Sequence, residues 1–397
     1  PPPSTARMTA APDVATRTPF WRDLRTLRVA AQLLAVVVVG SVIYYLWSNL
    51  MGNLRAAGLS TNFSFLTQPL GVDIAGSGAG PGTPIWRGLL VGVKNTFALV
   101  IVGIPILTVI GTLVGIGRLS TNWLVIRICT IYVELFRNLP PLLIIFFFFN
   151  AVVLRLPLLE NSSNPMGLLV VNNRFIAVTG FTAQPGLGAY WVIMGVTLLI
   201  SIWIWIQRTR RWERTGRPHQ RVLWSGGLLG AVGLIAFLLL GGPIALSVPV
   251  LDGRALAGGF RGLGSYFAVL VALVLYTASH VAEIVRGSIL AVPRGQTEAA
   301  NALALSPFQR LRHILLPQAM RIAIPPTISQ FLNFTKNTSL AIAIGYAEIT
   351  RITFQTIGNA QPAPQLVALL MLCYLVFSLT ISVVVNLLNR RLQYVTQ

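Results

Sequence analysis

Long apolar stretches alternate along this chain with short polar segments that carry most of its arginines. Eight stretches approach the roughly 20 apolar residues that a helix needs to cross a bilayer. They cover residues 29–48, 97–117, 138–156, 189–206, 222–242, 265–285, 325–345 and 366–388. The pattern predicts an all-α polytopic membrane protein with about eight transmembrane helices.

The arginines gather on alternate connections between the predicted spans. With the amino terminus in the cytoplasm, one side of the membrane holds the clusters within residues 17–28, 118–127, 208–221, 294–321 and 390–391, and the opposite connections hold scattered cations. This is a positive-inside pattern. It predicts cytoplasmic amino and carboxyl termini.

Composition supports a membrane protein and changes the interpretation of the net charge. Of 397 residues, 54% are hydrophobic and only 10% are charged, which is far more apolar than a soluble domain. The net charge of +20 would ordinarily suggest a nucleic-acid partner. No basic helix is interleaved with aromatic residues, so we expect no nucleic acid and interpret the arginines as topology determinants facing membrane lipid.

A polar loop at residues 293–317 interrupts the apolar pattern, and it predicts two short helices. Thr297 has the position of a cap for the first helix. Ser306, Pro307 and Gln309 have the order of a capping box with proline at the first helical position. Prolines at both ends close the loop.

Two alanines after Glu298 give the first helix a smooth face, which suits a helix that docks in a groove of another protein. The loop resembles the signature loop of ABC-importer permeases, in which Glu-Ala-Ala, a later glycine and Ile-x-Leu-Pro follow at fixed distances. Ala304 stands at the glycine position. In that family the loop is the coupling helix, which docks on a separate ATPase. The resemblance implies ATPase-coupling roles for Glu298, Ala299, Ala300, Ala304, Arg310, Arg312, Ile314, Leu316 and Pro317.

Three further segments resemble the permeases of polar amino-acid ABC importers. The first holds Glu134 and Arg137, which are three residues apart and can pair on one helix face. The second holds Glu283 and Arg286 at the same spacing. We expect these two pairs to be structural, with a charged gate as the alternative. The third is the Lys336-Asn-Thr-Ser-Leu run.

The resemblance implies a type I ABC-importer permease core of five helices plus about three extra ones. We divide the chain into a cytoplasmic tail (1–28), an extra span with an outer loop (29–91), a first core part (92–155), inserted spans with an arginine-rich cytoplasmic loop (156–261) and a second core part (262–397). The extra span and the insertion resemble the larger, general L-amino-acid permeases. Expected partners are an ABC ATPase dimer, a second permease chain of the same or a different kind, and an amino-acid-binding protein, in a bacterial inner membrane.

Lys336 lies within a predicted span, where a charge needs a partner, a cavity or a function. Asn333, Asn337, Thr338 and Ser339 surround it in the sequence. A cation with amides and hydroxyls can meet the α-carboxylate of an amino acid in a water-filled pathway. These residues are therefore the predicted substrate pathway; the alternative is that Lys336 pairs with a carboxylate or reaches toward the membrane interface.

Other chemistry is not predicted. The chain has no Walker A sequence, so ATP and Mg²⁺ are expected on the partner ATPase and no cofactor on this chain. The three histidines and two cysteines have no metal-ligand spacing, and no nucleophile is paired with a base. An enzyme is not expected. The alternatives are an ion-coupled secondary transporter, which would need no coupling loop, and an ABC permease for another small solute.

Overall fold

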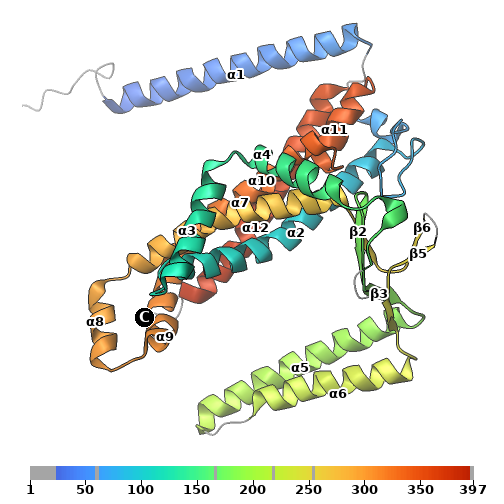
Figure 1. Cartoon of the computed structure of the whole chain (residues 1–397). Coiled ribbons are helices and arrows are strands. Elements are labelled where there is room, and N and C mark those ends of the chain that lie inside the picture. Colours follow the sequence, from blue (N-terminus) through green and yellow to red (C-terminus); the bar gives the residue numbers. More distant parts are fainter. Residues whose placement is uncertain (1–23, 59–61, 165–167, 217–219, 253–254, 394–397) are drawn as a thin grey trace, which may run out of the picture.

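A computed structural model of the chain describes residues 24–58, 62–164, 168–216, 220–252 and 255–393 and is mostly helical (Figure 1). The helices are α1 Leu24–Ala56, α2 Ile85–Gly117, α3 Trp123–Asn138, α4 Pro141–Phe147, α5 Leu187–Thr215, α6 Arg221–Leu239, α7 Gly264–Leu290, α8 Arg294–Ala302, α9 Pro307–Arg310, α10 Leu316–Asn337, α11 Ile349–Gly358 and α12 Ala363–Gln393. Short 3-10 or π-helical turns are η2 Ser64–Thr67, η3 Phe148–Val152, η4 Val153–Arg155, η5 Leu159–Asn161, η7 Leu311–Leu315 and η8 Thr338–Ile344.

The predicted class of helical membrane protein is confirmed, but the number of spans is not. Within the described residues, six helices are long and apolar enough to cross a membrane, or seven if the bent pair of α3 with the segment Pro141–Arg155 is one span. The six are α1, α2, α5, α6, α7 and α12. α10 is not among them.

The predicted span at 138–156 corresponds to the segment Pro141–Arg155, which passes from α4 into η3 and η4 and does not remain one regular α-helix. α3 ends at Asn138, and the chain turns by 107° before the segment Pro141–Arg155. Pro140 and Pro141 cause this break. Proline disfavours the helical conformation of the residue before it, whereas its fixed φ suits the first position of a new helix.

The predicted span at 325–345 also differs. α10 begins at Leu316 and runs through Pro325 and Pro326 to Asn337, where the 3-10 segment η8 takes over. Pro317 does not close the preceding loop, because α9 continues through the π-helical turn η7 into α10. Proline donates no backbone hydrogen bond, and the wider π turn accommodates this loss in the helical ladder.

Short strands in the segment between α4 and α7 were not predicted. The strands are β1 Leu169–Val171, β2 Phe175–Val178, β3 Gly180–Ala183, β4 Ile244–Ser247, β5 Val250–Asp252, β6 Ala255–Ala257 and β7 Phe260–Leu263. They pair antiparallel in the orders β1-β2-β7, β3-β4 and β5-β6. The chain entering the α5–α6 hairpin thus pairs with the chain leaving it, and the hairpin stands on this paired stalk beside the core helices (Figure 1).

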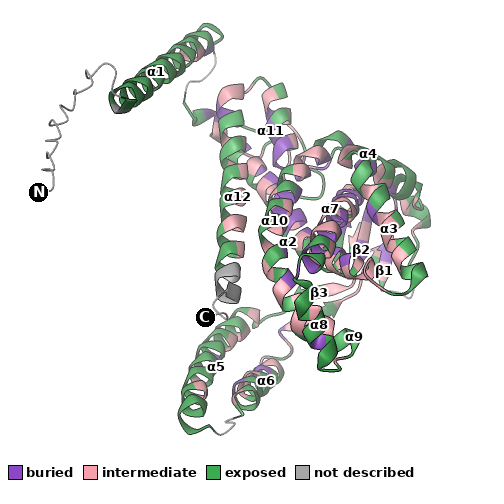
Figure 2. Ribbon diagram, turned by 90° about the vertical axis from the view of Figure 1, so that its left-hand side faces the viewer, coloured by how far each residue is buried: buried purple, intermediate pink, exposed green. Residues whose placement is uncertain are grey.

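The core centres on α7, which is the most heavily buried of the long helices (Figure 2). α2 packs along it through small residues. A Cβ atom added at Gly111 would lie 2.7 Å from the Val281 side chain, and one added at Gly115 would lie 2.6 Å from the carbonyl oxygen of Ala282. The two backbones approach as closely as glycine permits, which is how helices associate without a hydrophobic driving force in lipid.

We expect Gly115→Ala to destabilise the purified protein, because the new methyl group overlaps the backbone of α7 rather than a movable side chain. Overpacking of this kind costs about 1–3 kcal/mol, which a thermal unfolding scan in detergent would record as a lower Tm. Gly287→Ala is the matched control, since a Cβ at that position on α7 meets nothing within 4 Å. Equal Tm values for the two variants would contradict the packing.

Candidate functional site

The polar loop forms two short helices at one end of the bundle, between α7 and α10 (Figure 1). The first helix, α8, begins at Arg294, and its capping residue Pro293 supplies no side-chain hydrogen bond. The prediction that Thr297 caps this helix is therefore wrong, because Thr297 lies inside it. The proline before α8 fixes the start of the helix instead.

α8 ends in a Schellman motif. The amide of Leu305 donates to the carbonyl oxygen of Ala300 at 3.1 Å, and that of Ala304 donates to Asn301 at 2.9 Å. Ala304 has a φ of 53°, which is the left-handed region that favours glycine. The turn therefore needs the conformation that a glycine adopts freely, although alanine occupies the position.

The predicted capping box of the second helix is confirmed. The Ser306 hydroxyl accepts from the Gln309 amide at 3.3 Å, and the Gln309 side chain accepts from the Ser306 amide at 2.9 Å. Arg310 donates to the Asn301 side chain at 2.5 Å and so joins α9 to α8. These bonds fix the shape of the loop from inside.

The loop exposes both polar and apolar side chains, and we call its exposed residues Glu298, Ala299, Leu303, Phe308, Arg312 and Pro317 the loop face. Glu298 and Ala299 are exposed on it, whereas Ala300 is only 2% exposed and faces inward. Leu303 and Phe308 are 73% and 67% exposed. Sequence reasoning missed these two residues, although large apolar side chains in a polar loop were a visible signal. Arg312 and Pro317 are also exposed, while Ile314 and Leu316 are half-buried.

A cluster of charges joins three helices near the loop. The Glu283 carboxylate on α7 forms an ion pair with the Arg286 guanidinium, with an N–O distance of 2.5 Å, as the spacing predicted. The same carboxylate also pairs with Arg118, just after α2. Arg137 on α3 lies 3.7 Å from the same carboxylate. The predicted pairing of Arg137 with Glu134 is therefore replaced by a pairing across helices, and Glu134 is exposed.

A polar cavity of about 260 Å³ lies between α7 and α10. Its lining residues are Tyr276, Thr277, His280, Gln330, Asn333 and Asn337. Thr277 is near the midpoint of the 27-residue helix α7. Among the described residues, neither the Thr277 hydroxyl nor His280 Nε2 has a hydrogen-bond partner, although both atoms are buried. Buried polar atoms are normally paired, so the cavity suits a polar guest.

The structure brings only part of the predicted substrate pathway to this cavity. Asn333 and Asn337 line it, and Lys336 is exposed on the same helix without lining it. Thr338 is buried and its hydroxyl donates to the carbonyl oxygen of Thr335 at 2.7 Å. Ser339 donates to Lys336 in the same way at 2.8 Å. These two hydroxyls therefore bond to the backbone where α10 ends and the 3-10 segment η8 begins.

Four lining residues of the cavity were missed: Tyr276, Thr277, His280 and Gln330. A signal existed in the sequence, since Tyr276 and His280 are four residues apart in an otherwise apolar span, and their rings lie 4.8 Å apart. Helical spacing places such residues on one face. No group of three or more His, Cys, Asp or Glu side chains suited to a metal occurs among the residues that the structure describes.

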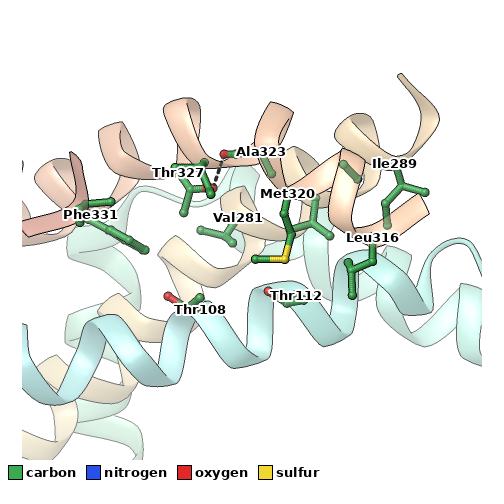
Figure 3. A pocket seen from close by; sticks show the side chains of 13 residues that line it. Thr108, Thr112, Val281, Ile289, Leu316, Met320, Ala323, Thr327 and Phe331 are labelled. Atoms are coloured by element: carbon green, nitrogen blue, oxygen red, sulfur yellow. Dashed lines mark hydrogen bonds between the residues drawn. The ribbon is translucent and has the colours of Figure 1, made fainter. Parts of the chain in front are cut away.

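A second cavity, of about 280 Å³, lies along the amino-terminal part of α10 and is apolar (Figure 3). Val281, Ile289, Met320 and Phe331 contribute to its lining. The hydroxyl of Thr327 in this lining already donates to Ala323 at 2.8 Å. The lining is otherwise mostly hydrocarbon, with Thr108 and Thr112 as its other hydroxyl-bearing residues, so the more polar cavity at His280 is the candidate site for a polar solute.

The sequence is similar to those of known transport proteins. Residues 225–394 match the family described as "Binding-protein-dependent transport system inner membrane component". The chain is 37% identical over 366 residues to the general L-amino acid transport system permease protein AapQ of Rhizobium johnstonii, with 92% of each chain covered. It is 36% identical to the glutamate/glutamine/aspartate/asparagine transport system permease protein BztB of Rhodobacter capsulatus, covering 94% of this chain and 95% of the relative.

A solved structure, "Crystal structure of an amino acid ABC transporter with histidines", aligns with 77% of this chain and 94% of its own at a TM-score of 0.44 and 17% identity. The two sequence relatives cover 92% and 94% of this chain, so their similarity extends beyond the core parts. The resemblance carried by the sequence motifs is therefore confirmed over nearly the whole length, and the chain belongs to the family of amino-acid ABC transporter permeases.

Proposed function

We propose that this chain is the permease subunit of an ATP-driven importer for polar L-amino acids and that the loop face couples it to a separate ATPase. The observation that carries the proposal is the shape of the loop: capped α8 and α9 present Glu298, Leu303 and Phe308 to solvent at the end of the bundle. A short helix with exposed apolar anchors beside an acid suits a groove on a partner.

ATP and Mg²⁺ belong to that partner ATPase, and no cofactor is assigned to this chain. Closure of the ATPase dimer pulls on the loop. The loop follows α7 directly and leads through η7 into α10. Because α7 and α10 also form the walls of the polar cavity, a movement of the loop changes the cavity. A second permease chain completes the pathway, and a binding protein delivers the amino acid from outside.

The polar cavity is the proposed place of the substrate. Its volume of about 260 Å³ is near the lower end of ligand pockets, which begin at about 300 Å³, so it suits one small solute. Amides of Asn333 and Asn337 are donors and acceptors for an amino acid in the cavity. Lys336 is exposed on the same helix outside the lining, so we assign its cation to the α-carboxylate along the pathway that leads to the cavity. The relatives named for L-amino acids, and for glutamate, glutamine, aspartate and asparagine, support this substrate class.

A bacterial inner membrane with both termini in the cytoplasm is the proposed setting. The loop between α7 and α10, the adjoining ends of α5 and α6, and the carboxyl end of α12 lie toward the same end of the molecule (Figures 1 and 2). These segments belong to the arginine-rich regions of the sequence. Positive charge collects on the cytoplasmic side, where an ATPase has access to the loop face.

An ion-coupled secondary transporter would need a titratable group for its proton or cation. Glu348 is the candidate, since burial raises the pKa of its carboxyl to about 7. Both oxygens are already in use: the amides of Thr350 and Arg351 donate to them at 2.8 Å each, and the Tyr374 hydroxyl donates at 3.2 Å. This geometry favours a cap of α11 over a relay.

Glu298→Lys is expected to abolish co-purification of the ATPase, because it reverses the charge at the centre of the loop face. The chain would be co-expressed with the ATPase encoded beside it and recovered by affinity purification. Glu213→Lys makes the same charge change in the last turn of α5 and should leave the ATPase bound. Retention of the ATPase by the Glu298 variant would argue against coupling through this loop.

Ala304→Gly is expected to stabilise the loop, since glycine adopts the left-handed conformation without the cost of about 1 kcal/mol that an L side chain carries. Ala302→Gly lies in the helical part of α8 and is the matched control. It should destabilise the protein by about 0.5–1 kcal/mol. Thermal unfolding of the purified chain compares the two, and a loss of stability in both would contradict the observed turn.

Lys336→Met is expected to raise the amino-acid concentration for half-maximal uptake by about tenfold or more, because a hydrogen bond to a charged group contributes about 1.5–3 kcal/mol. Lys336→Arg keeps the charge and should restore most of the affinity. Uptake would be measured in complexes that retain equal amounts of ATPase. Unchanged affinity and substrate range in the methionine variant would remove Lys336 from the pathway.

A further inference from the structure

The hairpin of α5 and α6 carries a cluster of arginines and tryptophans that the transport function does not use. Arg208 lies 4.5 Å from the ring centre of Trp224, and Arg221 lies 4.6 Å from that of Trp212 and 5.0 Å from that of Trp205. We call these five residues the Arg-Trp cluster. The expectation that no basic helix is interleaved with aromatic residues is therefore wrong for the end of α5. The positive-inside pattern explains why arginines occur near this connection, but not why two of them stack on tryptophans.

Stacked arginines are prepared to bind an anion. A guanidinium group can lie on an aromatic face and still present the N–H groups of its edge to a phosphate. Arg221 uses one of its five N–H donors for the hydroxyl of Thr209 at 3.3 Å. Exposed Arg210, Arg211 and Arg214 follow on the same helix end, with Glu213 as the acid between them. The surroundings are strongly positive.

An apolar groove of about 300 Å³ leads away from the cluster between the two helices. Leu198, Ile202, Val222 and Leu229 line it together with Trp205, which also belongs to the Arg-Trp cluster. The serine hydroxyls in its floor are already bonded: Ser201 donates to the carbonyl oxygen of Ser225 at 3.2 Å, and Ser225 donates to that of Arg221 at 2.6 Å. The groove therefore presents hydrocarbon only.

The depth of the cluster matches the surface of a bilayer. Trp191, at the other end of α5, is exposed and lies 17 residues before Arg208. At a rise of about 1.5 Å per residue this is about 26 Å, close to the hydrocarbon thickness of about 30 Å. Tryptophans mark both membrane interfaces, so the arginines lie at the level of the lipid headgroups on the side of the α8–α9 loop (Figure 1).

We propose that the α5–α6 hairpin binds an anionic phospholipid, with the phosphate on Arg208 and Arg221 and one acyl chain in the groove. The proposal goes beyond amino-acid transport and does not depend on it. Charge complementarity selects the occupant, because an apolar groove that ends at a cationic cluster matches a molecule with an apolar chain and an anionic head. A helix of a neighbouring protein would match the groove but not the cluster.

The test titrates the delipidated full-length chain in detergent with phosphatidylglycerol or phosphatidylcholine and counts retained lipids by native mass spectrometry. Phosphatidylglycerol should be retained in preference. The double variant Arg208→Gln, Arg221→Gln should weaken its binding by about 30-fold, since each cation near a membrane surface contributes about 1 kcal/mol. Arg87→Gln is the matched control, because Arg87 also lies over a tryptophan, at 5.1 Å from the Trp86 ring, but belongs to α2 and not to the α5–α6 hairpin.

Gly226→Trp provides a second variant, since Gly226 lines the groove and a Cβ there meets nothing within 4 Å. It should lower phosphatidylglycerol binding without changing the arginines. Unchanged binding in both variants, or equal retention of the two lipids by the original chain, would overturn the proposal. Displacement of phosphatidylglycerol by millimolar inorganic phosphate would show that the arginines bind only an anion, and it would contradict a role of the groove in lipid binding. The same variants would also be purified as part of the transporter complex. If they lose the second permease chain there, the hairpin is a protein interface and the lipid proposal is wrong.

Discussion

The close approach of α2 and α7 is the constraint on which the rest of the structure depends. Glycines on α2 allow the two backbones to touch, and α7 is thereby enclosed along most of its length. At the end of this contact, Glu283 binds Arg118 and Arg286 and lies near Arg137. One carboxylate among three guanidinium groups leaves a net positive charge, and this single acid joins α7 to Arg118 at the end of α2 and to Arg137 in the last turn of α3.

This constraint links the loop face to the polar cavity. α7 and α10 form both walls of the cavity, and the loop face lies between their ends. The caps and the Arg310–Asn301 bond make the loop a compact unit. A force on this unit therefore reaches both helices rather than being absorbed by a flexible connection. The apolar cavity between the same helices lies closer to the loop and offers room for such a movement.

Local features of this structure could be predicted from the sequence, and distant contacts could not. The capping box at Ser306 and the Glu283–Arg286 pair follow from spacing within one helix turn. The predicted start of a span at residue 138 agrees with the break at Pro140 and Pro141, but spacing along the sequence does not give the angle of 107° between α3 and the segment that follows. The partner of Arg137 lies on another helix, so its own neighbour Glu134 looked equally suitable. Similarly, the cavity combines residues of two helices, and only Asn333 and Asn337 on α10 are predicted from the sequence.

The central claim is that this chain moves amino acids through coupling to ATP hydrolysis. Its most direct test is uptake of labelled L-glutamate and L-glutamine into proteoliposomes that contain this chain, its ATPase, its second permease chain and its binding protein. The account predicts uptake that requires ATP on the side of the ATPase and continues when ionophores abolish all ion gradients. Uptake that needs a proton or sodium gradient and proceeds without the ATPase would contradict it.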